Sequence, residues 1–189
     1  DNGGLSTSEG HPTSNLPFRA GKGWLYEGGI REPCIVAAPG GAVKAVCDTP
    51  VTSADLLPTI LDLCGVEPDA DRPIDGRSLR PMLERPRGKA VPRDLFWHYP
   101  HYGNQGGEPS SIIRDGDHKL IRYYEDGHEE LYNVKEDISE ANDLAAIHPD
   151  LVKKLSTKLT AHLTEVGAKI PKRDPRFDAE EKVRQIKTL

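Results

Sequence analysis

The chain has 189 residues, and its 25 basic and 30 acidic side chains leave a formal net charge of −5. A net negative chain lacks the broad attraction to phosphate backbones and anionic lipid heads, which argues against nucleic-acid and membrane-surface binding. Its apolar runs fall far short of the roughly 20 residues that a membrane span needs. Glycine occurs 18 times and proline 16 times, so we expect much of the chain to form loops and turns.

The first apolar run, Cys34–Ala38, is closed by a Pro-Gly-Gly sequence. Such a run is typical of a strand buried on both faces of a parallel or mixed sheet, with a buried helical turn as the alternative. The three cysteines, Cys34, Cys47 and Cys64, lack metal-binding spacing, and an odd number cannot pair completely within the chain. We expect them to be buried, apolar thiols.

A helix is predicted directly after Thr52 and Ser53, either of which can cap its first turn. Asp55 then lies where a negative charge favours a helix N-terminus. Apolar residues follow at helical spacing until Gly65 ends the helix, and they are Leu56, Leu57, Ile60, Leu61 and Cys64.

Farther along, apolar and aromatic runs alternate with turn signals. The runs are Leu95–Trp97, Ser111–Arg114, Lys119–Tyr124 and Glu130–Val134, and Asp-Gly pairs separate the later ones. Asp-Gly between such runs is a strong hairpin signal, so we predict an antiparallel meander of three or four strands. A long helix from Pro149 to near Gly167 is predicted to cover the meander, because Val152, Leu155, Leu159, Leu163 and Val166 recur at helical spacing.

Two segments near the start of the chain carry candidate chemistry. Asp1 and Asn2 precede two glycines, and side-chain oxygens beside such backbone can bind a hard divalent cation, with an Asn-Gly turn as the alternative. Lys22 lies between Gly21 and Gly23, where its ammonium can grip a sulfate or phosphate while the backbone approaches closely. An exposed turn is the alternative there, and the spacing is not that of a P-loop.

A cluster of histidines and aromatic residues ends the first predicted strand of the meander. His98 and His101 lie within Trp97–Tyr102, and the glycine-rich segment Gly103–Gly107 follows. Histidines where a strand meets a loop can bind the sugar or aryl part of a substrate, or protonate a leaving oxygen. Packing at the strand end is the alternative, because aromatic residues also build cores.

In order and spacing, these motifs resemble the C-terminal portion of the type I sulfatases, the arylsulfatase-like family. The matching stretches are Asp1–Gly4, Arg19–Gly23, Tyr26–Pro33, Thr52–Thr59, Asp75–Leu79, Lys119–Ile121 and Glu130–Asn133. The resemblance implies an α/β fold in which residues 1–90 are the C-terminal segments of an alkaline-phosphatase-like mixed sheet. Residues 91–170 would form a small antiparallel sheet with a covering C-terminal helix, and residues 171–189 a tail.

The resemblance also implies roles for individual residues. Asp1 and Asn2 would be two calcium ligands, and Lys22 would contact the sulfate and stabilise charge as the S–O bond breaks. Glu27 and Arg31 would be structural, as a buried pair or as backbone clamps. The substrate would be a sulfated small molecule or saccharide, and a periplasmic or extracellular location is expected by the same analogy.

One departure from the family pattern limits what this chain does alone. The family's nucleophile is a formylglycine made from the Cys or Ser of a CxPxR-type motif, and none of the three cysteines begins such a motif. We expect the nucleophile and the larger N-terminal part of the catalytic domain upstream, so that this chain is inactive by itself. Two other functions remain open: a phosphate or phosphonate ester hydrolase of the same superfamily, and a non-catalytic binding module.

Overall fold

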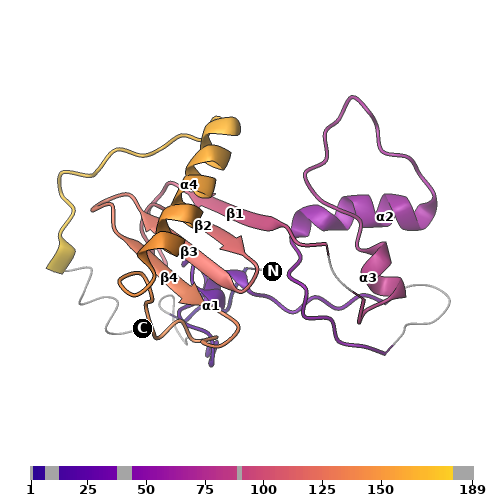
Figure 1. Ribbon diagram of the computed structural model, residues 1–189, viewed down its shortest axis with the longest axis horizontal. Coiled ribbons are helices and arrows are strands. Elements are labelled where there is room, and N and C mark those ends of the chain that lie inside the picture. The colour runs from indigo at the N-terminus through magenta and orange to yellow at the C-terminus, as the bar shows by residue number, and fades with distance from the viewer. Residues whose placement is uncertain (1, 7–12, 38–43, 89–90, 181–189) are drawn as a thin grey trace. The chain divides into compact units, whose positions relative to one another are not determined.

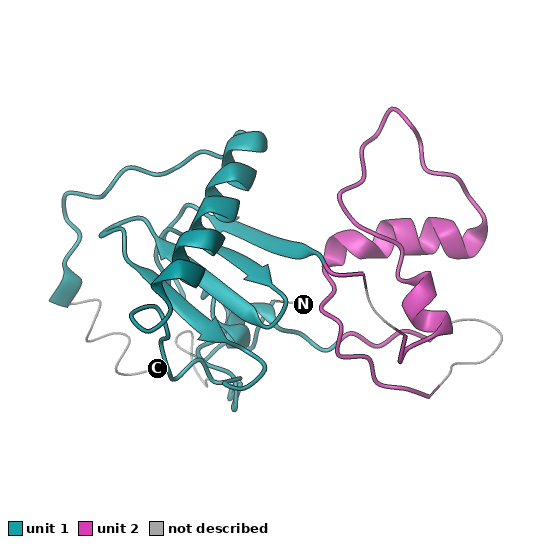
Figure 2. Cartoon of the chain, in the orientation of Figure 1, with its two compact units in different colours: residues 1–33, 93–189 teal, residues 34–92 magenta. Residues whose placement is uncertain are grey.

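The computed structural model describes residues 2–6, 13–37, 44–88 and 91–180 (Figure 1). The chain forms two compact units, one of residues 1–33 and 93–189 (unit 1) and one of residues 34–92 (unit 2) (Figure 2). The sequence-based division grouped residues 1–33 with 34–90, whereas the compact units group residues 1–33 with the sheet that follows. None of the described helices is long and apolar enough to cross a membrane.

Unit 1 is built on an antiparallel sheet with the strand order β1-β2-β3-β4, which confirms the predicted meander. The strands are β1 (Asp94–Tyr99), β2 (Ser110–Asp115), β3 (His118–Tyr123) and β4 (Glu129–Asn133). Ile113 lies opposite Leu120 and Ile112 opposite Ile121 in the β2–β3 pair. Because successive side chains of a strand point to opposite faces, this register gives the sheet two apolar faces.

The helix α4 (Pro149–Glu165) covers one face of the sheet (Figure 1). The cluster buried between helix and sheet consists of Ile113, Leu120, Leu131, Leu155, Leu159 and Leu163. Three of the five apolar positions that predicted this helix are thus in its buried stripe, while Val166 is exposed just beyond the last turn. Burying an apolar stripe against a sheet is what stabilises such a helix in water.

The segment that leads into the short helix α1 (Glu27–Ile30) covers the other face. Its buried partners in the sheet are aromatic as well as aliphatic, and the cluster consists of Ala20, Trp24, Tyr26, Ile112, Ile121, Tyr123, Tyr132 and Val134. The glycine-rich first part of the chain is therefore one of the two layers that bury the sheet.

Unit 2 contains a 3₁₀ turn (Ser53–Asp55), the helix α2 (Leu56–Cys64) and the short helix α3 (Arg80–Glu84). The Thr52 N–H donates to the Asp55 carboxylate at 2.8 Å. Gly65 ends α2 in the left-handed conformation, at φ +67°. The predicted helix, its start and its end are all confirmed.

Two expectations for unit 2 are wrong. Residues 34–37 are exposed and form no strand, and Ala38 lies outside the described residues. In the described part of unit 2 there is no strand to pair with this run, and an unpaired strand is not stable by itself. Cys34, Cys47 and Cys64 are exposed rather than buried, because no second apolar layer from the described residues packs on them.

Candidate functional site

Lys22 lies in a loop whose two ends are joined by backbone hydrogen bonds. The Gly28 N–H donates to the Arg19 carbonyl at 2.9 Å, and the Trp24 N–H donates to the Gly21 carbonyl at 3.0 Å. The second bond makes a tight turn around Lys22 and Gly23, and Lys22 remains partly exposed. Among the residues that the structure describes, none hydrogen-bonds or ion-pairs with the Lys22 ammonium. Its three N–H donors can therefore be offered to an anion.

The first residues of the chain contact this turn. The Lys22 N–H donates to the Gly4 carbonyl at 3.1 Å, and the Gly3 N–H donates to the Glu32 carboxylate. A Cβ on Gly3 would lie 2.7 Å from the Gly28 carbonyl oxygen and 3.0 Å from the Lys22 backbone nitrogen, so only glycine fits there. Asn2, which directly precedes Gly3, is exposed. The structure thus brings the Asn2–Gly4 end and the Lys22 turn together, whereas Asp1 lies outside the described residues.

The glycine-rich loop after β1 also packs on the turn, at Gly23 and Trp24. The Trp24 indole N–H donates to the Gln105 carbonyl at 3.1 Å. Gly106 adopts φ +105°, and a Cβ there would lie 2.4 Å from the Trp24 ring, so the loop backbone lies directly on the indole. His101 is exposed beside this loop and packs edge-on against Tyr99, with ring centroids 5.5 Å apart. The loop predicted to contact the substrate therefore adjoins the turn of Lys22, the residue predicted to bind the sulfate.

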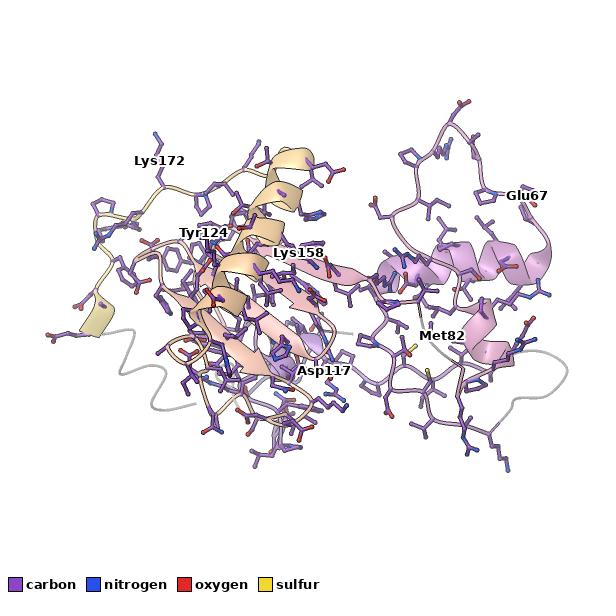
Figure 3. The ribbon with its side chains drawn as sticks, viewed as in Figure 1. Glu67, Met82, Asp117, Tyr124, Lys158 and Lys172 are labelled. Carbon is purple, nitrogen blue, oxygen red and sulfur yellow. The ribbon has the colours of Figure 1, made fainter. Side chains whose placement is uncertain are left out.

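His98 differs from His101 in having partners for both ring nitrogens within unit 1. Its Nδ1 lies 2.7 Å from the Ser111 hydroxyl, and its Nε2 lies 3.1 Å from the Lys169 carbonyl. A carbonyl only accepts, so Nε2 carries a proton. The Ser111 hydroxyl also pairs with Tyr124, which Figure 3 labels beside the sheet. These contacts agree with the alternative that His98 packs at the end of the strand. His101 is the more accessible of the two histidines.

Glu27 is buried and surrounded by cations. Its carboxylate lies 3.1 Å from the Lys119 ammonium, 3.5 Å from the Arg31 guanidinium and 3.8 Å from that of Arg114. Glu27 pairs with Arg31, but the pair is only half buried because the Arg31 side chain is 43% exposed. Lys119 is a closer partner that the sequence reasoning missed. A signal existed: Lys119 lies two residues before Ile121 in β3 and so on the same buried face, where an unpaired lysine would be costly.

A calcium site is not complete among the described residues. Within those ranges no group of three or more His, Cys, Asp or Glu side chains could hold a metal ion. Of the two predicted ligands, only Asn2 is described, and it offers one neutral oxygen, whereas calcium takes six to eight oxygen ligands. Residues of this chain therefore fit calcium as a part of a larger ligand set.

Residues 20–169 match the family described as N-sulphoglucosamine sulphohydrolase, C-terminal. This match spans Lys22, the Glu27 network, unit 2, the sheet and helix α4. The chain belongs to this family of sulfatase C-terminal domains. The resemblance that the motifs indicated is thereby confirmed.

Named relatives agree with this membership. A sulfatase from Formosa agariphila is 35% identical over 183 residues, which are 89% of this chain and 32% of that protein. Human arylsulfatase A is 40% identical over 88 residues, which are 47% of this chain and 17% of that protein. The chain therefore spans about a third, or less, of the length of these relatives.

Solved structures support the fold. A protein in complex with its substrate D-glucosamine-2-N,6-O-disulfate matches with a TM-score of 0.50 and 33% identity, over 58% of this chain and 23% of that one. A protein crystallised with k-i-k-neocarrahexaose matches with a TM-score of 0.63 and 24% identity, over 90% of this chain and 36% of that one. The second likeness shows the shared α/β fold, with a small antiparallel sheet covered by a C-terminal helix.

Proposed function

We propose that this chain is the C-terminal part of an enzyme that hydrolyses sulfate esters, and that Lys22 binds the sulfate group. The observation that carries the proposal is the meeting of three glycine-rich segments around the Lys22 turn, where the ammonium has no partner among the described residues. A lysine ammonium is a compact charge with three donors, which suits a tetrahedral oxyanion. Membership of a sulfatase family supports the choice of sulfate esters.

Asp1 and Asn2 are proposed as two calcium ligands of the same site. Gly3 and Gly4 contact the backbone around Lys22, which keeps Asn2 close to the turn. Bound calcium would polarise the sulfate oxygens. The remaining ligands and a formylglycine nucleophile would come from outside this chain. For that reason we expect this chain to show no turnover by itself.

The proposed substrate is a sulfated saccharide or small molecule. The loop of residues 103–107 adjoins the Lys22 turn, and the exposed His101 shortly precedes that loop. The loop and His101 would therefore contact the sugar or aryl group while His98 holds the strand end. A sulfated sugar is supported by the relative solved with D-glucosamine-2-N,6-O-disulfate. A periplasmic or extracellular location remains part of the proposal by family analogy.

The test uses the complete enzyme, meaning this chain preceded by the sulfatase portion that its relatives carry. Lys22→Ala is expected to lower kcat/KM for 4-nitrophenyl sulfate about 100-fold or more, as when one donor to a developing charge is removed. Lys172→Ala is the matched control, because Lys172 is an exposed lysine on the segment after α4 (Figure 3). A clear preference for 4-nitrophenyl phosphate would favour the phosphatase alternative. Unchanged activity of Lys22→Ala would favour a non-catalytic module.

A further inference from the structure

Glu140, in the connection between β4 and α4, has an unusual backbone conformation. It is fully buried and adopts φ +51°, a region that residues other than glycine rarely occupy. Such strain persists only where surrounding contacts hold it. The connection carries no predicted site residue, so this strain calls for a separate explanation.

Two contacts of Glu140 are directed at the segment that carries Lys22. Its backbone carbonyl accepts a hydrogen bond from the Arg19 guanidinium at 3.0 Å. Its carboxylate accepts the Glu27 N–H at 2.6 Å. Arg19 and Glu27 lie at the two ends of the Lys22 loop, which the Gly28 N–H closes by donating to the Arg19 carbonyl. One residue therefore holds both ends of the loop.

Charged and aromatic groups surround this attachment. The Lys119 ammonium lies 2.7 Å from the Glu140 carboxylate and 3.1 Å from that of Glu27, and all three side chains are almost completely buried. Arg19 also lies over the Tyr26 ring, with its guanidinium carbon 3.9 Å from the centroid. Burial raises the pKa of the Glu140 carboxyl, while Lys119 acts in the opposite direction. The loop is thus tied to β3 of the sheet by buried charges rather than by surface contacts.

We propose that Glu140 is a positioning residue for Lys22: by fixing Arg19 and Glu27 to the sheet, it holds the Lys22 ammonium where the sulfate binds. This inference rests on the proposed function, because it takes Lys22 as the sulfate ligand. Correct placement matters because a displacement of about 1 Å can cost about 100-fold in rate. Glu140 itself touches no reacting atom in this proposal.

Two substitutions in the complete enzyme separate the roles of the Glu140 side chain. Glu140→Ala removes the acceptor of the Glu27 N–H, whereas Glu140→Gln keeps an oxygen there. We expect Glu140→Ala to lower kcat/KM for 4-nitrophenyl sulfate by about 10-fold or more, and Glu140→Gln to stay within about threefold. Lys158→Met is the control, because Lys158 makes charged contacts on the α4 side of the sheet, and it should stay within about twofold.

A double-substitution cycle and amide hydrogen exchange distinguish positioning from stability. If Glu140 acts through Lys22, adding Glu140→Ala to Lys22→Ala should lower the rate by less than about twofold further. Exchange of the amides of residues 19–27 should be faster in Glu140→Ala and unchanged in Lys158→Met. If Glu140→Ala does not fold, Glu140→Asp replaces it, since its carboxylate is one methylene shorter.

Unchanged amide exchange of residues 19–27 in Glu140→Ala would overturn the proposal. So would a double variant whose loss of rate equals the product of the losses of Glu140→Ala and Lys22→Ala. Failure of the proposed function looks different: the enzyme would not depend on Lys22 at all. In that case Glu140 has no sulfate ligand to position, and the exchange measurement still reports whether it holds the loop.

Discussion

Unit 1 and unit 2 are stabilised by different kinds of contact. In unit 1 both faces of the sheet bury apolar side chains, against α4 on one side and the Lys22 segment on the other. The described residues of unit 2 bury only Asp55, Thr59 and Leu79. Helix α2 instead exposes most of its apolar residues, namely Leu56, Leu57, Ile60 and Leu63. An apolar pattern at helical spacing thus produced a helix in both units, but a buried helix face in only one.

The described part of unit 2 depends on hydrogen bonds to the backbone instead. The buried Asp55 carboxylate accepts the N–H groups of Thr52 and Arg77, at 2.8 and 2.9 Å. The Thr59 hydroxyl donates to the Asp55 carbonyl and accepts the Leu79 N–H. Such bonds contribute about 0.5–1.5 kcal/mol each, against about 1.5–3 kcal/mol for a fully buried leucine. This comparison predicts which substitutions matter in each unit.

The largest difference should come from paired leucine substitutions. Leu155→Ala, in the cluster under α4, is expected to lower the free energy of unfolding by about 2–5 kcal/mol through lost burial and a cavity. Leu57→Ala, at a side chain 55% exposed, should cost less than about 0.5 kcal/mol beyond any change in helix propensity. Urea unfolding of the 189-residue chain measures both. Equal losses of unfolding free energy in the two variants would contradict the difference between the units, because Leu57 would then have to be buried like Leu155.

Glycines of positive φ offer a second pair. Gly106→Ala should cost about 2–4 kcal/mol, because a Cβ there overlaps the Trp24 ring in addition to the left-handed strain. Gly65→Ala has the strain alone, since nothing lies within 4 Å of its Cβ position, and should cost about 1 kcal/mol. Thermal unfolding compares them. A cost at Gly106 no larger than at Gly65 would mean that the loop is not packed on the indole.

Asp55→Ala tests the polar anchor of unit 2. It leaves the Thr52 and Arg77 N–H groups without their acceptor, so we expect a loss of about 1–3 kcal/mol and faster amide exchange around residue 77. Asp69→Ala is the control, because the Asp69 carboxylate is exposed where it accepts the Asp71 N–H and pairs with Arg72, so its loss should change stability by less than about 0.5 kcal/mol. Similar exchange in both variants would show that Asp55 does not hold this part of the chain.

The smallest predicted effect is pH-dependent and belongs to unit 1. Hydrogen bonds from Lys158 lower the pKa of Asp115 below 3.8, and the same contacts raise that of Lys158 above 10.5. The Asp115–Lys158 pair therefore stabilises the folded state between pH 3.8 and pH 10.5. This stabilisation is lost as the pH falls through the lowered pKa of Asp115 or rises through the raised pKa of Lys158. Lys158 is partly exposed (Figure 3), so Lys158→Met should cost about 1 kcal/mol or less at pH 7. Urea midpoints at pH 7, 3 and 11 should show a difference between the variant and the parent that is largest at pH 7 and smaller at pH 3 and pH 11.

Local patterns predicted most of the elements correctly. The meander followed from Asp-Gly turns between apolar runs, α2 from its cap and Gly65, and α4 from the leucines at Leu155, Leu159 and Leu163. The run Cys34–Ala38 failed as a strand because strand formation depends on a neighbour, which a local window cannot supply. The sequence-based division grouped residues 1–33 with residues 34–90, whereas the compact units group them with the sheet, because glycine-rich loops carry no periodicity that shows which face they cover.

For the candidate site, the sequence by itself determined the chemical groups, their family resemblance and the turns that present them. The choice of Lys22 and of the loop near His101 came from residue types and glycine spacing, which are local properties. Only the tertiary structure decided that the Asn2–Gly4 end, the Lys22 turn and the loop at Gln105 pack together, and that Glu140 holds the turn from far along the chain. These contacts join segments separated by up to 121 positions, and close packing and buried charge, which act in space, select them.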